Sequence, residues 1–464
     1  MENSLLHKVK REFKDPNIYD IYNLTENPFP NSPFINPNNA DKRYNGGIYE
    51  ESVRQKEITS ITNEFLKRPQ TDSNHYRMGY VLDKSYVGRG NGKSSYATHI
   101  INKINKNYCI DISNELNKCF GIYVEPDTNG RTRSFVQLID LIVKAIFNSS
   151  IIEYSIAAIR LEAFLKSDIL KLEDIATLPE DEIITNLNSK SWLEERFTYN
   201  WELRQKYNQA LNDNPWFSKL SPSFPLNTSQ NLFTSEIDKN DIFEYYYLSL
   251  KKDTDKISFL FNDLVLLFLI AGFNGAYIFV DDFERIPDFQ SDRQKRDFAL
   301  ELRTSLFDGS SENAKIGFYN FILMLHAGVP RLIEKAWSES GMEQRSPITT
   351  EGASHVIIFD KLNETHAVSL LKKYLSEFRI TAETDIKPFN DEAIKKIGES
   401  CEYNAAKMLQ SAHNLLKAAA EQKITIIDEL FVTNQLQITS IELEAPKSII
   451  DEQSLNLQDK ANGK

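Results

Sequence analysis

The stretch VGRGNGKSS, from Val87 to Ser95, decides the fold of this chain. It follows an apolar segment that reads as a strand and precedes a segment with the apolar spacing of a helix. Gly88, Gly90 and Gly92 permit positive φ, so successive backbone N–H groups can turn inward around an anion. The helix that follows directs its positive end to the same place. The stretch therefore predicts a phosphate-binding loop between a strand and a helix.

The side chains of this loop predict nucleotide chemistry. The loop fits the Walker A pattern GxxxxGK[ST] except at its first position, where Val87 stands in place of glycine. In this pattern Lys93 reaches the β- and γ-phosphates of a nucleotide, and Ser94 supplies a hydroxyl to Mg²⁺. A glycine-rich hairpin that contains GKS by chance is the alternative. The complete set predicted to bind ATP is Gly88, Arg89, Gly90, Asn91, Gly92, Lys93, Ser94 and Ser95.

A second motif, AYIFVDDFERI from Ala276 to Ile286, supports the first. Apolar residues lead directly into Asp281 and Asp282, and buried parallel strands end at the ligand edge of a sheet. Asp281 is predicted to hold Mg²⁺ through water, as a Walker B aspartate does. Asp282 or Glu284 would then polarise the attacking water. An acidic turn after a core strand is the alternative, and the order of the two motifs favours the catalytic interpretation.

The rest of the chain predicts an α/β fold with a parallel sheet, because strand-like and helix-like segments alternate. The expected strands are 79–87, 120–125, 276–280, 318–325 and 355–359. We predict an N-terminal segment and linker packing on the nucleotide-binding core (1–75), a first core part (76–150) and a helical insertion (151–255). The second core part (256–360), an all-helical C-terminal lid domain (361–438) and a mobile tail (439–464) follow.

The order of these features resembles the AAA+ superfamily of P-loop ATPases, and most of all its origin-recognition and STAND-like branch. The resemblance covers residues 27–435 without the 150–255 insertion. It implies an AAA+ core with a helical lid, ATP and Mg²⁺ as ligands, and ATP sites between subunits of an oligomer. The phrases GFNGAYIFVDD and LHAGVP are also similar to parts of ATP-binding proteins from bacterial phage-exclusion (BREX-type) systems.

The resemblance also implies roles for single residues. His326 would be the sensor-1 residue that reads the γ-phosphate, although a histidine can also simply end a strand. Arg345 stands where relatives place an arginine finger that reaches a neighbouring subunit, with Arg303 and Arg331 as competitors. An exposed loop arginine is the plain alternative. Ala406 stands where the sensor-2 arginine would be, which puts that contact in doubt.

Composition limits the other function classes. The chain has 464 residues, with 66 acidic and 54 basic side chains and a formal net charge of −12, which argues against a basic coat for non-specific nucleic-acid binding. Three scattered cysteines and the absence of an apolar leader or a membrane-length apolar run predict a cytoplasmic protein without a membrane anchor. Zinc-site spacings, a GxSxG elbow and protein-kinase signatures are absent from the sequence.

These features predict an ATPase that assembles into a homo-oligomer, a ring or filament, and uses Mg-ATP to recruit or remodel a protein partner in a DNA-related or antiphage defence complex. A nucleotide-gated, STAND-like scaffold that hydrolyses slowly and holds a separate effector is the second hypothesis. A degenerate ATPase that only binds nucleotide is the third, and Val87 and Ala406 keep it open. Nucleic acid is left open as a further partner.

Overall fold

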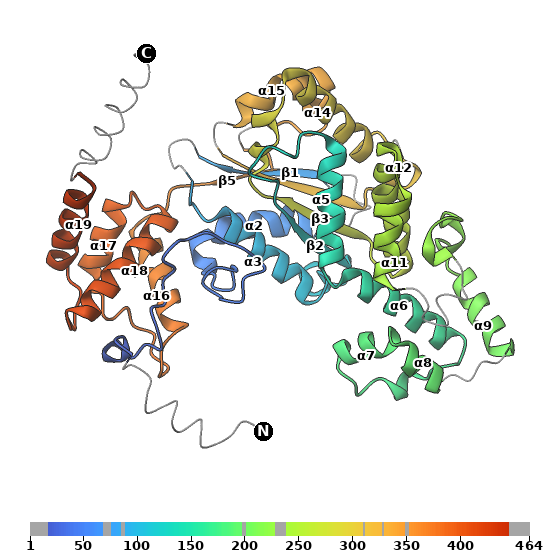
Figure 1. Cartoon of the computed structure of the whole chain (residues 1–464), viewed down its shortest axis with the longest axis horizontal. Helices are drawn as coiled ribbons and strands as arrows, with labels where there is room; N and C mark the ends of the chain where they lie inside the picture. The colour runs from blue at the N-terminus through green and yellow to red at the C-terminus, as the bar shows by residue number, and fades with distance from the viewer. Residues whose placement is uncertain are drawn as a thin grey trace, which may run out of the picture. The chain divides into compact units, whose positions relative to one another are not determined.

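The computed structural model divides into two compact units, coloured along the chain in Figure 1. A sheet-containing unit comprises Gln55–Arg89 and Lys93–Asp360, and a helical unit comprises the chain up to Arg54, Gly90–Gly92 and the residues from Lys361. The structure describes residues 17–67, 76–84, 89–196, 201–227, 238–309, 311–326, 329–348 and 352–444. Val87, Gly88 and the predicted tail beyond residue 444 therefore lie outside the described residues.

The sheet of the first unit has five parallel strands in the order β2-β3-β4-β1-β5. All residues of β3 and β4 are buried, as expected for central parallel strands that are covered on both faces. The predicted α/β class with a parallel sheet is thus confirmed. The strands are β1 (Met78–Asp83), β2 (Cys119–Val124), β3 (Gly275–Val280), β4 (Tyr319–Leu325) and β5 (Val356–Phe359).

Helices cover this sheet and fill the connections between its strands. α3 and α5 pack against β2, α2 packs against β5, and α5 crosses one face of the sheet in Figure 1. The flanking helices are α2 (Gln55–Ile61), α3 (Lys93–Lys106), α4 (Ile110–Ser113), α5 (Phe135–Asn148), α12 (Asp253–Ser258), α13 (Val265–Ile270), α14 (Asp292–Leu306) and α15 (Val329–Ser340). π-helical turns at Phe259–Leu264 join α12 to α13.

The described residues between α5 and α12 are helices, turns and loops. The buried guanidinium of Arg160 donates to the Leu187 carbonyl (3.1 Å) and to Asn188 Oδ1 (2.7 Å), which fastens the first helix of this region to the end of the second. The helices are α6 (Ile151–Lys166), α7 (Glu180–Leu187), α8 (Lys190–Arg196), α9 (Trp201–Asn212) and α11 (Lys239–Glu244). No described helix alone is long and apolar enough to cross a membrane; only α5 and α6, bent by 61°, pass that test as a pair.

The helical unit has its own apolar core. Leu24 and Phe29, from the N-terminal segment, are fully buried in it, and Phe29 stacks on Tyr374 with ring centroids 6.2 Å apart. The described part of the predicted 1–75 segment is therefore divided, because residues 17–54 group with the C-terminal helices and Gln55–Lys67 group with the sheet. The helices of this unit are α16 (Glu364–Ser376), α17 (Asp391–Ser400), α18 (Ala405–Glu421) and α19 (Glu429–Glu444).

A side-chain amide protects the edge of the sheet at β2. Asn105 on α3 accepts the Gly121 N–H through Oδ1 (2.7 Å) and donates to the Gly121 carbonyl through Nδ2 (3.0 Å). β2 is an edge strand, so these backbone groups face away from β3. Gly121 also lets α3 approach closely, because a Cβ there would lie 3.2 Å from Ile101. The amide thus replaces a missing neighbouring strand.

Replacing Asn105 by leucine should lower the free energy of unfolding by about 1 kcal/mol, because two backbone groups lose their partner. Urea denaturation measures this change. Asn102→Leu, a substitution of another exposed asparagine on α3, is the matched control and should change stability less. Equal stability of the two variants would contradict the role assigned to Asn105.

Candidate functional site

The carboxyl ends of three strands bring polar side chains to one edge of the sheet. Asp83 is the last residue of β1, His326 follows β4, and Asp281 follows β3. β4 pairs with both other strands, with Leu325 opposite Leu82 and Leu323 opposite Val280. The histidine at the end of β4 is therefore held between the ends of β1 and β3. In parallel α/β sheets this edge is where ligands bind.

Lys93, the first residue of α3, forms a buried ion pair at this edge. Its Nζ contacts Asp83 Oδ2, and the two side chains are only 6% and 3% exposed. His326 Nδ1 lies 3.1 Å from the same oxygen and 3.3 Å from Lys93 Nζ. One buried carboxylate oxygen is thus the partner of both the Lys93 ammonium and the His326 imidazole.

His326 also contacts Glu284, on the other side of its ring. His326 Nε2 lies 2.9 Å from Glu284 Oε1, and Arg89 approaches the same oxygen at 3.7 Å. Burial alone would lower the pKa of His326, but its contacts with Asp83 and Glu284 outweigh burial and raise the pKa to about 9. Burial likewise opposes ionisation of Glu284, and its contact with His326 reverses the effect, so the pKa of Glu284 is lowered.

The contact between His326 and Glu284 is an ion pair rather than a well-directed hydrogen bond. Both oxygens of Glu284 and Nε2 of His326 are buried, and among the described residues they make no hydrogen bond of regular geometry. Such buried polar atoms are costly without partners, and they often mark a ligand position. Both side chains therefore have polar atoms that can pair with water or a ligand.

Tyr123 on β2 links the two residues predicted to bind Mg²⁺. Its hydroxyl donates to Asp281 Oδ2 at 2.6 Å and interacts with Ser94. Asp281 Oδ1 accepts the Asp282 N–H at 2.9 Å, which fixes the carboxylate. Asp281 and Ser94 thus offer a carboxylate and a hydroxyl near one side chain, and oxygen donors are those that Mg²⁺ prefers. The donor set therefore fits Mg²⁺.

Asp282 differs from Glu284 in its surroundings. Its φ of +43° is in the left-handed region, and its carboxylate is paired with Arg285. Burial, followed by repulsion from Asp281 and Glu284, raises its pKa. Ligand atoms of Asp282, Glu284 and His326 all lie within 4.8 Å of one another, which is a spacing that a divalent cation can bridge. Asp282 thus pairs with an arginine three residues further along the chain, whereas Glu284 pairs with His326, which follows β4.

The described glycines of the loop have the backbone that an anion-binding loop needs. Gly90 has φ of +95° and Gly92 has φ of +86°. The Gly90 carbonyl accepts the Ala406 N–H at 3.0 Å, and a Cβ at Gly90 would lie 2.6 Å from the Ala406 Cβ. The buried Asn91 accepts from Arg54 through Oδ1 at 2.8 Å. Ala406 thus contacts the loop directly, although its methyl group cannot supply the charge of a sensor-2 arginine.

The three arginines considered for a trans finger differ in their partners. Arg345 is half exposed and pairs with Asp308 at 3.0 Å, while Arg303 pairs with the same carboxylate at 2.9 Å. Arg303 also donates to the Ser340 carbonyl at 2.7 Å. Arg331, on α15, is exposed and has no ion pair within the described ranges. The role of Arg345 stays a prediction, and Arg331 is the arginine with the fewest restraints.

Two functional candidates, Asp83 and Tyr123, are missing from the sequence-based prediction. Asp83 was expected in the middle of a strand from 79 to 87, whereas β1 ends at Asp83. The signal is an acid that interrupts an apolar run ten residues before the loop lysine. Tyr123 gives no such signal, because its role depends on β2 lying beside β3.

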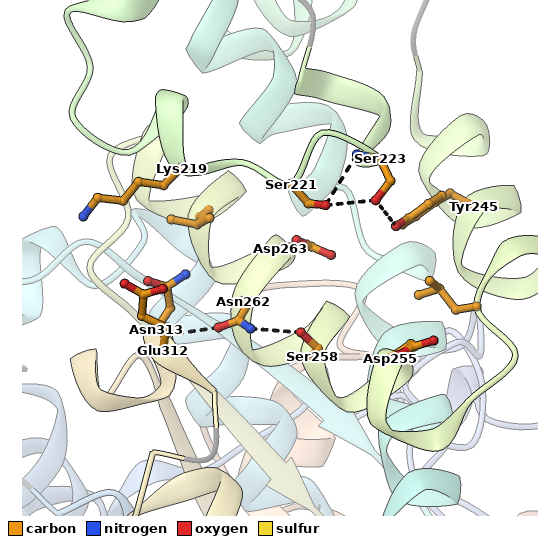
Figure 2. A pocket seen from close by; sticks show the side chains of 12 residues that line it. Lys219, Ser221, Ser223, Tyr245, Asp255, Ser258, Asn262, Asp263, Glu312 and Asn313 are labelled. Atoms are coloured by element: carbon orange, nitrogen blue, oxygen red, sulfur yellow. Dashed lines mark hydrogen bonds between the residues drawn. The ribbon is translucent and has the colours of Figure 1, made fainter.

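A separate cavity of about 450 Å³ lies in the sheet-containing unit, between the helical region and the π-helical turns before α13 (Figure 2). Ser221, Ser223 and Tyr245 form a chain of hydroxyl contacts of 2.9 and 3.0 Å along its wall. Asp263 faces the cavity, and no described residue makes a hydrogen bond or ion pair with its carboxylate. Burial raises the pKa of Asp263 to about 6. Sequence reasoning did not predict this cavity.

Solved structures that resemble this chain include a nucleotide-bound protein. The solved structure of the Aeropyrum pernix ORC2 protein, in ADPNP-ADP complexes, is similar over 89% of this chain and 73% of that chain, with 10% identity and a TM-score of 0.40. A likeness at this level establishes neither a common fold nor a function. No protein-family model and no curated protein matches the sequence.

The raised pKa of His326 gives a pH dependence of stability. A group whose pKa is higher in the folded than in the unfolded protein stabilises the fold fully below its unfolded pKa, near 6.5. That stabilisation is lost as the pH rises through about 9. Urea denaturation between pH 6 and 10 should therefore show a fall in stability that His326→Gln reduces. Parallel pH profiles of the two proteins would contradict the buried, charged histidine.

Ionisation of Asp263 should destabilise the fold, whereas ionisation of a carboxylate in a salt bridge stabilises it. Its folded pKa of about 6 lies above its unfolded value of 3.8, so ionisation opposes folding increasingly between these pH values. Asp263→Asn should raise the melting temperature at pH 7 and leave it nearly unchanged at pH 4. Asp255→Asn, at an exposed cavity residue, is the control and should have little effect at either pH. A loss of stability in Asp263→Asn at pH 7 would refute this account.

Proposed function

We propose that this chain binds ATP with Mg²⁺ at the carboxyl edge of its sheet and hydrolyses it, as a P-loop ATPase of the AAA+ type. The single observation that supports the proposal is the position of Lys93. It begins a helix directly after two positive-φ glycines, and it faces the acidic ends of parallel strands. The order of motifs along the chain points to the same class.

Each residue of the site has a separate role in the proposed hydrolysis of ATP. Lys93 neutralises charge on the β- and γ-phosphates, and the backbone amides of the loop bind their oxygens. Glu284 accepts the proton of the attacking water, because it is ionised and has buried oxygens without well-directed hydrogen bonds. His326 donates to the γ-phosphate. Asp282, held by Arg285, assists by orienting the water.

Ser94 and Asp281 are the residues that would hold Mg²⁺, with Tyr123 aligning them. When bound, the ion neutralises phosphate charge and orients the phosphates. Ser94, on α3, and Asp281, directly after β3, would present the two oxygen donors. The remaining loop residues of the proposed site are Gly88, Arg89, Gly90, Asn91, Gly92 and Ser95.

A nucleotide-gated scaffold with slow turnover is the second candidate function. One observation favours it, because in the described site Lys93 is already neutralised by Asp83 and Glu284 is already paired with His326. Both pairs oppose rapid catalysis. In this proposal ATP fixes an assembled homo-oligomer, Arg345 or Arg331 of a neighbouring subunit completes the site, and the helical region binds a protein partner.

The biological setting remains part of the proposal. Cys109, Cys119 and Cys401 are buried thiols with no disulfide between them, which is consistent with the reducing cytoplasm. A role in a DNA-related or phage-defence complex is a hypothesis that rests on the sequence likeness alone.

Lys93→Ala should weaken binding of a fluorescent ATP analogue about 10- to 100-fold, because a charge-assisted contact to phosphate is lost. Lys106→Ala, which removes an exposed lysine from the same helix, is the matched control and should bind like the wild type. Fluorescence anisotropy in the presence of Mg²⁺ measures both affinities. Equal binding by Lys93→Ala and the wild type would overturn the nucleotide site.

Turnover distinguishes hydrolysis from binding alone. Asp282→Asn combined with Glu284→Gln should keep nucleotide affinity within a few-fold and lose about 100-fold or more in phosphate release, since no carboxylate accepts the proton. Retained hydrolysis in the double variant would refute these roles. If the wild type hydrolyses very slowly and light scattering shows ATP-dependent assembly, the scaffold function is supported instead of the motor.

A further inference from the structure

We propose that Asp83 is a competing counter-ion for the nucleotide: it holds Lys93 in the empty site and yields it to phosphate, so that this carboxylate sets nucleotide affinity. The inference rests on the proposed nucleotide-binding function and concerns a residue outside its predicted machinery. It starts from one oxygen, Asp83 Oδ2, which contacts Lys93 Nζ and lies 3.1 Å from His326 Nδ1.

Burial makes this competition strong. The side chains of Lys93 and Asp83 are 6% and 3% exposed, so water and salt screen their attraction little. An ammonium removed from water needs a counter-charge, and in the empty site the only acidic oxygen described in contact with Nζ is that of Asp83. A phosphate that approaches Nζ meets both a neutralised ammonium and a nearby negative charge. Asp83 therefore opposes nucleotide binding.

His326 lowers the free-energy cost of moving Lys93 from Asp83 to phosphate. When Lys93 turns to phosphate, Asp83 keeps the imidazole at 3.1 Å as a partner and is not left as a lone buried charge. Removing the last partner of a buried charge is strongly destabilising, whereas exchanging one of two partners is not. The geometry thus supports a reversible transfer of Lys93 from Asp83 to phosphate.

The same chain of contacts extends to Glu284, because His326 touches Asp83 through Nδ1 and Glu284 through Nε2. Because these contacts use different ring nitrogens, the imidazole can hold both carboxylates when Lys93 moves to phosphate. Asp83 acts through Lys93 and His326 in this scheme and does not contact the reacting atoms.

Isothermal titration with Mg·ADP tests the proposal, because ADP avoids hydrolysis and lacks the γ-phosphate that His326 is proposed to read. Asp83→Asn should bind ADP about 10-fold more tightly than the wild type, since the competing charge is gone. Asp83→Glu restores the charge and should return the affinity toward the wild-type value. A residue that merely positions Lys93 for phosphate predicts the reverse, with weaker binding by Asp83→Asn.

His326→Gln is a second variant that tests the same competition, and it keeps the proposal testable if Asp83→Asn fails to fold. It removes one of the two described cationic partners of Asp83, so Lys93 should be held more firmly and ADP affinity should fall. Unchanged or weaker ADP binding by Asp83→Asn, with a wild-type circular dichroism spectrum, overturns the inference. Equal ADP binding by the wild type and Lys93→Ala instead overturns the proposed function, so the two failures are distinguishable.

Discussion

One buried carboxylate oxygen, Asp83 Oδ2, is the constraint on which the rest of the site depends. It faces Lys93 and His326 in a place that water hardly reaches, and each of these groups would be costly to bury alone. The strand order makes this meeting possible, because β4 lies between β1 and β3 and presents His326 to the acids on both sides. Glu284 then completes a row of alternating charge through His326.

This arrangement gives the proposed site a defined resting state. Lys93 and Glu284, the two groups that nucleotide chemistry needs most, are each held by a partner rather than exposed to solvent. A phosphate that binds must replace Asp83 as the partner of Lys93. The glycine loop has a parallel constraint in the helical unit, where Gly90 accepts from the Ala406 N–H and leaves no room for a side chain. Such contacts couple loop conformation to α18 without a charged residue at position 406.

The sequence predicted the position of most strands well, because an apolar run is a local feature. β4 was expected at 318–325 and is Tyr319–Leu325, and β3 was expected at 276–280 and is Gly275–Val280. Asp83 and Tyr123 were missed because their roles come from strand order, which is not a local property. The packing of Leu24 and Phe29 with the C-terminal helices was also not foreseen, since the N-terminal segment was expected to pack on the nucleotide-binding core.

A crystal structure with ADPNP and Mg²⁺ tests the central claim most directly, because it reports the partner of the Lys93 ammonium. The account predicts the β- and γ-phosphates within hydrogen-bond distance of Nζ, with Nζ withdrawn from Asp83 and His326 still paired with Asp83. A nucleotide bound elsewhere, or a Lys93 that stays on Asp83 while nucleotide occupies the loop, would contradict it.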